Sequence, residues 1–230
     1  MELYSRIRVK FPPEETMFRR ASADVWSIMF EPFEDQFNDY SATDTIIEYP
    51  HSTYTNSTVG DTYLLNDGWR HRLHSQFSKL KIRREVLDLA DTILPEQIGQ
   101  CIGILYRGEK ALAVEQRTGV LSSPEAICER VDRISRHWPV FVCADSREAN
   151  ERFGRILGGR MLFWEQADRC ERIGQGFGPG LGDDHLRKTL AMVLALSRTQ
   201  HFVHGISNMA TGVLYINPWL LHTFVETTTP

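Results

Sequence analysis

The chain has 230 residues, of which 42% are hydrophobic and 24% are charged, and its formal net charge at pH 7 is −4. This composition is ordinary for a soluble globular protein, and the length allows one large domain or two small ones with a substantial core. A weakly acidic chain lacks the basic surface that nucleic-acid binding requires, so we expect no nucleic-acid partner.

The start of the chain has none of the features of a targeting segment. Met1 to Phe11 alternates charged and apolar residues, without the continuous apolar core of a signal peptide. No stretch approaches the roughly 18 apolar residues of a membrane span. We therefore expect a cytoplasmic protein with no membrane span. The sequence leaves its oligomeric state open, a homo-oligomer included.

The cysteines and histidines do not form a metal-binding pattern. The four cysteines are widely spaced without a CxxC pair, so we interpret them as reduced and structural. His71 and His74 lie in a polar connector, whereas His201 and His204 lie in an apolar strand. In a strand, residues i and i+3 point to opposite faces. We therefore expect no metal site.

The first 76 residues contain short strands and few strong helices. Residues 4–11 alternate between apolar and polar side chains, which predicts a strand with one wet face. Residues 23–30 fit a strand or a short helix, residues 44–49 a short strand, and residues 51–60 a loop. We predict a reduced N-terminal lobe over residues 1–76.

Residues 77–230 alternate between helices and apolar strands. An amphipathic helix is expected over 78–94. Strands follow at 101–106, 140–144, 160–164 and 201–203, with helices at 124–136, 147–157, 183–196 and 209–215. Continuous apolar strands separated by helices are typical of a parallel sheet covered on both faces. The sequence therefore predicts an α/β fold with a doubly wound parallel sheet.

Several helix ends carry residues that suit them. Ser123 precedes Pro124, Asp145 or Ser146 precedes the helix at 147, and Ser207 precedes the helix at 209. Gly158 and Gly159 are typical of a helix end. The glycine-rich stretch 174–182 lacks the spacing of a dinucleotide fingerprint. It fits a loop over a ligand or a plain linker.

Three segments of the second half, in this order, resemble the motifs of the fucosyltransferase superfamily that includes bacterial nodulation and protein O-fucosyltransferases. They are Ile102–Gly108 (IGILYRG), Phe141–Ser146 (FVCADS) and Leu194–Asn208, a helix end followed by a strand and a Ser-Asn turn. The resemblance covers about residues 76–217. It implies that residues 77–230 form a Rossmann-like, nucleotide-sugar-binding domain of the GT-B type. It places the acceptor side in residues 1–76.

The resemblance also implies a reaction. The chain is expected to be an inverting, metal-independent glycosyltransferase whose donor is a GDP-sugar, most simply GDP-fucose, with no further cofactor. Arg107 stands where the family motif has its arginine, and a guanidinium can neutralise a leaving diphosphate without a metal. Ser207 and Asn208, with the N–H groups of the helix that follows, imply a second anion site. Ordinary helix capping is the alternative for Ser207.

Further site residues follow from the same resemblance. Glu115 lies ten residues after Leu105, where the family's α-1,6 members have an acidic residue, and would be the general base for the acceptor hydroxyl. A solvated loop position is the alternative. Asp145 and Ser146 occupy the strand-end acid position and are candidate substrate-binding residues, or else helix caps. Asp168 is a candidate contact to the nucleotide base.

Departures from the family pattern leave other functions open. Leu105 stands where the motif has a histidine, and Gly108 stands where a second arginine or a histidine is usual. The N-terminal lobe is also short. One alternative is a catalytically inactive relative that binds a nucleotide, a glycan or a partner protein. Another is a different enzyme on the same sheet, acting on an anionic small molecule. The acceptor is not identified by the sequence.

Overall fold

The computed structural model describes residues 7–10, 28–31, 45–48, 67–94, 100–108, 123–165, 182–205 and 207–225. Within them a five-stranded sheet has the order β5-β4-β3-β6-β7. The strands are β3 (Ile102–Tyr106), β4 (Val140–Ala144), β5 (Met161–Leu162), β6 (His201–His204) and β7 (Leu221–Phe224). All four neighbouring pairs are parallel. The predicted α/β fold with a doubly wound parallel sheet is confirmed.

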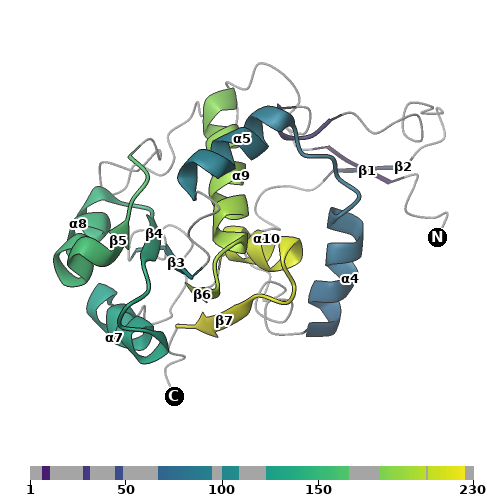
Figure 1. Cartoon of the computed structure of the whole chain (residues 1–230). Helices are drawn as coiled ribbons and strands as arrows, with labels where there is room; N and C mark the ends of the chain where they lie inside the picture. The colour runs from purple at the N-terminus through teal and green to yellow at the C-terminus, as the bar shows by residue number, and fades with distance from the viewer. Residues whose placement is uncertain are drawn as a thin grey trace.

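Helices cover both faces of the sheet (Figure 1). They are α5 (Arg84–Ile93), α7 (Pro124–Ile134), α8 (Arg147–Leu157), α9 (Asp183–Ser197) and α10 (Asn208–Ile216). Residues of α7 and α8 share a core cluster with Ile102 and Val142, whereas residues of α5, α9 and α10 share another with Leu105 and Phe202. Successive strand residues point to opposite faces, so β3, β4 and β6 each contribute to both clusters.

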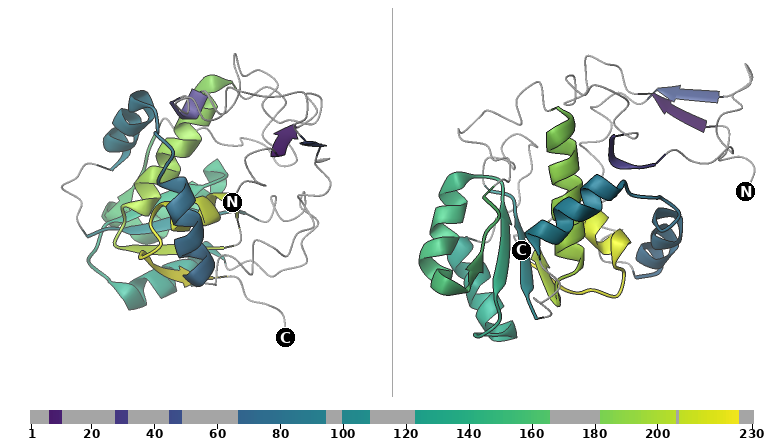
Figure 2. Two further views of the ribbon diagram at one scale, coloured as in Figure 1. Left: turned by 90° about the vertical axis from the view of Figure 1, so that its right-hand side faces the viewer. Right: turned by 45° about the horizontal axis from the view of Figure 1, so that its top comes forward.

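The order of the strands contains a reversal next to β3. From β3 the chain adds β4 and then β5 on one side, after which α9 leads to β6 on the other side of β3, and then to β7. Figure 2 shows α9 crossing close to the middle of the sheet. The topological switch point therefore lies between β3 and β6. Open α/β sheets bind their ligands outside the carboxyl ends of the strands at such a point.

The close approach of α9 to β3 depends on Gly103. A Cβ added there would lie 2.9 Å from Thr199 Cγ2 and 3.0 Å from Leu196 Cδ2. The hydroxyl of Thr199 donates to the carbonyl of Leu196 at 2.8 Å, and the N–H of Gln200 donates to the carbonyl of Cys101 at 2.8 Å. The turn between α9 and β6 is thus bonded to the start of β3, with no space for a larger residue at position 103.

The predicted helix caps are confirmed for the two helices on the α7–α8 face. The hydroxyl of Ser123 accepts from the N–H of Ala126, and that of Ser146 accepts from the N–H of Ala149, both at 3.2 Å. Gly158 ends α8 with φ +55°, a conformation that glycine adopts without strain.

The amphipathic helix predicted for residues 78–94 begins later than expected, at Arg84. The residues before it pair with another segment: Phe30 and Ile82 form an antiparallel bridge. The N–H of Glu31 donates to the carbonyl of Lys81 at 2.7 Å, and the N–H of Arg83 donates to that of Met29 at 3.1 Å. Because their backbone groups are bonded in this way, residues 81–83 are not available to a helix.

Two elements were not predicted. Helix α4 (Asp67–Phe77) contains His71 and His74, which the sequence had placed in a polar connector. It packs against α10, and Nδ1 of His74 donates to the carbonyl of Tyr215 at 2.8 Å. Both imidazoles also contact the exposed ring of Trp219. Strand β7 is the second addition.

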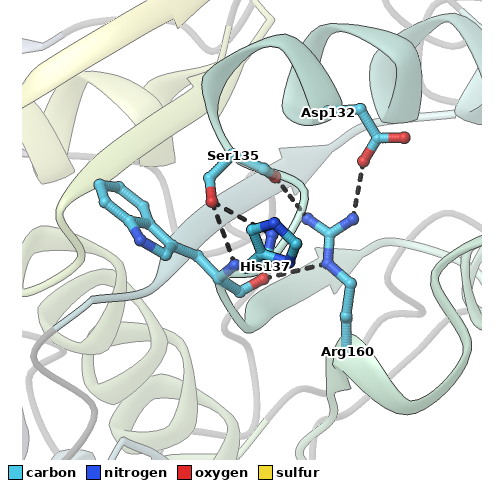
Figure 3. A network of polar contacts seen from close by, with 5 residues as sticks. Asp132, Ser135, His137 and Arg160 are labelled. Carbon is cyan, nitrogen blue, oxygen red and sulfur yellow. Dashed lines mark hydrogen bonds and ion pairs between the residues drawn. The ribbon is translucent and has the colours of Figure 1, made fainter.

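The third predicted strand is shorter than expected, because Arg160 belongs to the 3-10 turn η3 (Gly158–Arg160) and β5 has only two residues. The guanidinium of Arg160 holds the connection between α7 and β4, residues 135–139, by hydrogen bonds (Figure 3). It donates to the carbonyls of Ser135 and Trp138 at 2.7 and 3.2 Å, and pairs with Asp132 at 2.7 Å. The hydroxyl of Ser135 accepts from the N–H groups of His137 and Trp138.

The described part of the first 66 residues is small. Strands β1 (Ile7–Lys10) and β2 (Thr45–Glu48) form a parallel pair, which confirms the two strands predicted there. The loop predicted at 51–60 lies outside the described residues, as does the glycine-rich stretch up to residue 181. The division at residues 76–77 falls at the end of α4 and stays a prediction.

We predict that Gly103→Ala destabilises the protein by about 1–3 kcal/mol, because the new methyl group overlaps Thr199 and Leu196. Urea unfolding measures the loss. Thr199→Ser removes the nearest methyl group and keeps the hydroxyl that bonds Leu196, so adding it to Gly103→Ala should recover part of the stability. Equal stability of wild type and Gly103→Ala would contradict the packing described for β3.

Candidate functional site

The predicted site residues with described positions follow the three central strands of the sheet. Arg107 comes directly after β3 and is half-buried. Asp145 and Ser146 follow β4, and Ser207 follows β6. Since the strands are parallel and in register, these residues lie at one edge of the sheet, with Arg107 and Ser207 on either side of the switch point.

Asp145 contacts the segment that carries Arg107. The N–H of Asp145 donates to the carbonyl of Tyr106 at 3.2 Å, and Oδ2 of Asp145 accepts from the N–H of Gly108 at 2.9 Å. Its neighbour Ser146 is buried and caps α8. In this structure Ser146 has the capping role that was the alternative to substrate binding.

Ser207 caps α10 in the same manner. Its hydroxyl accepts from the N–H of Met209 at 3.1 Å, and its side chain is buried. The carbonyl of Ser207 accepts from the hydroxyl of Thr211 at 3.2 Å. The serine therefore fixes the start of α10 at the sheet edge. The hydroxyl is used for capping, so an anion at this turn would be bound by the N–H groups at the start of α10.

The remaining predicted residues are only partly open to comparison. Glu115 and Asp168 lie outside the described residues. Asn208 is the first residue of α10, but its side chain is not among the described ones. The roles of these three residues stay predictions.

A histidine pair beside Ser207 was missed by the sequence analysis, because strand β7 was not predicted. His204, at the end of β6, is completely buried and stacks between the rings of Phe202 and His222. Nδ1 of His204 lies 3.0 Å from the carbonyl oxygen of Gly205, and Nε2 lies 3.0 Å from Nδ1 of His222. The pair thus connects β7 to the turn that leads into Ser207.

The hydrogen bonds determine where the protons of this pair reside. The carbonyl oxygen of Gly205 can only accept, so Nδ1 of His204 carries the proton. Nε2 of the neutral His204 ring is then an acceptor, and the proton between the two rings belongs to Nδ1 of His222. The hydrogen bonds therefore run in one direction, from His222 to His204 and from His204 to the carbonyl of Gly205. Nε2 of the neutral His222 carries no proton and can accept one.

Burial keeps both imidazoles neutral. The pKa of His204 is lowered to about 4, chiefly by burial; the hydrogen bond to Gly205 acts in the opposite direction, and the neighbouring His222 and Arg70 add to the lowering. The pKa of His222 is also lowered, first by burial and then by the positive charges of Arg70 and His201. Arg70 lies on α4 and is itself buried. Protonation of His204 would add a positive charge near the buried Arg70, and the bond between the rings would then persist only if the proton of His222 moved from Nδ1 to Nε2.

Two cysteines of the sheet region are unreactive thiols. Burial raises the pKa of Cys101 to about 11 and that of Cys128 to about 12, so both stay protonated at neutral pH. Among the described residues, no three histidine, cysteine or acidic side chains are grouped in a way that could hold a metal ion. No helix in the described part of the chain is long and apolar enough to cross a membrane.

Comparison with known proteins adds the fold relationship. No protein-family model and no curated protein sequence matches the chain. Among solved structures, it is similar to NodZ α-1,6-fucosyltransferase co-crystallised with GDP, with a TM-score of 0.52 and 15% identity over 96% of this chain and 84% of that one. Fucosyltransferase NodZ from Bradyrhizobium gives a TM-score of 0.52 and 14% identity over the same shares. The chain has a fucosyltransferase-like fold.

We predict that stability falls as the pH is lowered from about 6.5 toward 4. The unfolded chain binds protons at its histidines near pH 6.5, whereas folded His204 does not until about pH 4. Each such proton contributes a slope of up to about 1.4 kcal/mol per pH unit, and the effect is absent above about pH 7.

The variant His204→Phe separates this effect from the titration of carboxylates, which both proteins share. Urea unfolding at several pH values should give a steeper acid-side loss for the wild type than for His204→Phe, whatever their difference at pH 8. Parallel curves between pH 4.5 and 7 would show that His204 is not held neutral.

Proposed function

We propose that the chain is a glycosyltransferase-like enzyme that uses a GDP-sugar, most simply GDP-fucose, as its donor. The observation that supports this most is the place of Arg107. It follows the central strand, next to the switch point of a sheet whose fold is similar to that of a fucosyltransferase co-crystallised with GDP. A guanidinium at this edge is suited to the two phosphates of a nucleoside diphosphate.

In the proposed reaction, the oxygen of an acceptor hydroxyl attacks the anomeric carbon of the sugar, and the bond from that carbon to the GDP oxygen breaks. Negative charge develops on the leaving diphosphate. Arg107 would stabilise this charge from the β3 side, and the N–H groups at the start of α10 would do so from the β6 side. Two such groups supply the charge stabilisation that a divalent metal supplies elsewhere, so we propose metal-independent transfer.

The acceptor proton needs a base, and Glu115 is our candidate for that role. A single displacement inverts the configuration at the anomeric carbon. We place the acceptor on the side of residues 1–76, and the nucleotide-sugar donor on residues 77–230. Asp168 is proposed to contact the nucleotide base.

One feature favours a second function, that of a catalytically inactive binding protein. Leu105, where the family motif has a histidine, is buried in the apolar cluster beneath α9 and α10. It can give neither a hydrogen bond nor a proton to a nucleotide. Turnover of GDP-fucose, by transfer or by hydrolysis, would exclude this second function.

We predict that Arg107→Ala weakens GDP binding by roughly tenfold to a hundredfold, as expected for the loss of a charge-assisted pair of hydrogen bonds. Arg107→Lys keeps the charge but not the forked arrangement of donors, so its affinity for GDP should lie between those of the wild type and Arg107→Ala. Isothermal titration calorimetry with GDP measures all three affinities.

Arg198→Ala is the matched control, because it removes the same charge at the end of α9, where Arg198 pairs with Asp91. That end of α9 precedes β6 and so lies at the amino edge of the sheet. GDP affinity should be unchanged in this variant. Equal binding of GDP by wild type and Arg107→Ala would contradict the role of Arg107, and no binding by the wild type would contradict the proposed donor.

A further inference from the structure

Asp145 is hydrogen-bonded to the segment that carries Arg107 both before and after that residue. The carbonyl of Tyr106 accepts from the backbone N–H of Asp145 at 3.2 Å. The N–H of Gly108 donates to Oδ2 of Asp145 at 2.9 Å. One bond uses the backbone of Asp145 and the other its side chain, so the peptide groups before and after Arg107 are fixed together.

The residue after Arg107 is small enough for the carboxylate to lie against it. A Cβ added to Gly108 would be 3.2 Å from Oδ1 and 3.8 Å from Oδ2 of Asp145. The separation of 3.2 Å is tighter than ordinary carbon–oxygen contact. A side chain at position 108 would therefore require the carboxylate to shift by a few tenths of an ångström from the place where it accepts the N–H of Gly108.

Asp145 is itself held by α8. The next residue, Ser146, caps that helix, and its carbonyl accepts from both the backbone and the side-chain N–H groups of Asn150. Tyr106 is also fixed from this side, since its ring meets that of Phe153 edge-on at 5.4 Å. A continuous set of bonds and contacts thus runs from the start of α8, through Asp145, to the backbone around Arg107.

We propose that Asp145 is a positioning residue that sets the direction of Arg107 toward the diphosphate, rather than a residue that binds the donor itself. This inference rests on the proposed function. The carboxylate acts through the N–H of Gly108: a charged acceptor forms a stronger and shorter bond than a neutral one, and it limits the rotation of the peptide that follows Arg107. The sequence offered Asp145 as a substrate-binding residue or a helix cap, and our proposal gives it a different role.

Two variants of Asp145 separate positioning from direct binding. Asp145→Asn retains an oxygen that can accept from Gly108, so GDP affinity should stay within about threefold of the wild type. Asp145→Ala removes the acceptor and should weaken binding about tenfold, the equivalent of one charged hydrogen bond. If Asp145 binds the donor through its charge, Asp145→Asn and Asp145→Ala will lose affinity to the same extent, which would overturn the proposal.

Coupling between residues gives a second criterion. In an Arg107→Ala background, Asp145→Ala should cause no further loss of GDP affinity, because there is no guanidinium left to direct. Gly108→Ala should weaken binding in the wild type but add little in an Asp145→Ala background, where no carboxylate is displaced. Additive losses in both double variants would contradict positioning.

A measurement without any ligand completes the test. Hydrogen exchange of the Gly108 amide, followed by NMR, should be slow in the wild type and in Asp145→Asn, and fast in Asp145→Ala. The amide of Val142 in β4 serves as the control for intact folding and should stay protected in all three. Fast exchange of Gly108 in the wild type would overturn the proposal. Failure of the wild type to bind GDP would instead contradict the proposed function, and the exchange of Gly108 would still show whether Asp145 holds the backbone beside Arg107.

Discussion

Strand β3 is hydrogen-bonded on both sides, to β4 and to β6, and this double pairing determines where Arg107, Asp145 and Ser207 lie. Tyr106 pairs with Ala144, and Leu105 pairs with His204. The residues that follow these strands consequently lie side by side at the carboxyl ends of the strands. The apolar residues of β3 enter the clusters on both faces of the sheet, so the strand cannot shift without disturbing the two cores together.

The two turns beside the switch point are held by different chemistry. The turn after β3 is fixed by Oδ2 of Asp145, which accepts from the N–H of Gly108. The turn after β6 is fixed by His204, whose ring is effective as long as it is neutral. Burial lowers the pKa of His204, so its neutral form persists into the acidic pH range.

The sequence was sufficient for the central strands β3 and β4 because they are continuous apolar runs, a pattern that a strand buried on both faces requires. Helix caps such as Ser123 and Ser146 were likewise predictable, because they are local. Interactions between distant segments were not. The start of α5 depends on pairing with Phe30, and α4 is polar enough to be mistaken for a connector.

The same limit applies to the site. Arg107 and Ser207 could be placed from the ends of apolar runs, whereas the partner of His204 could not, because Leu221–Phe224 is short and has two polar residues between two apolar ones. The bond from Gly108 to Asp145 joins residues 37 positions apart. A motif shows which residue types are present, but only the register of β3 and β4 shows that this carboxylate accepts from the backbone beside Arg107.

The shortness of β5 affects how the molecule meets other chains. It is the last strand of the sheet on that side and contributes only Met161 and Leu162. A long, flat edge strand has a row of unpaired peptide N–H and C=O groups. A strand from another molecule can pair with them, which leads to aggregation. Here the ladder ends after two residues. This margin of the sheet therefore offers little template for intermolecular β-pairing, which favours persistence of the folded chain at high concentration.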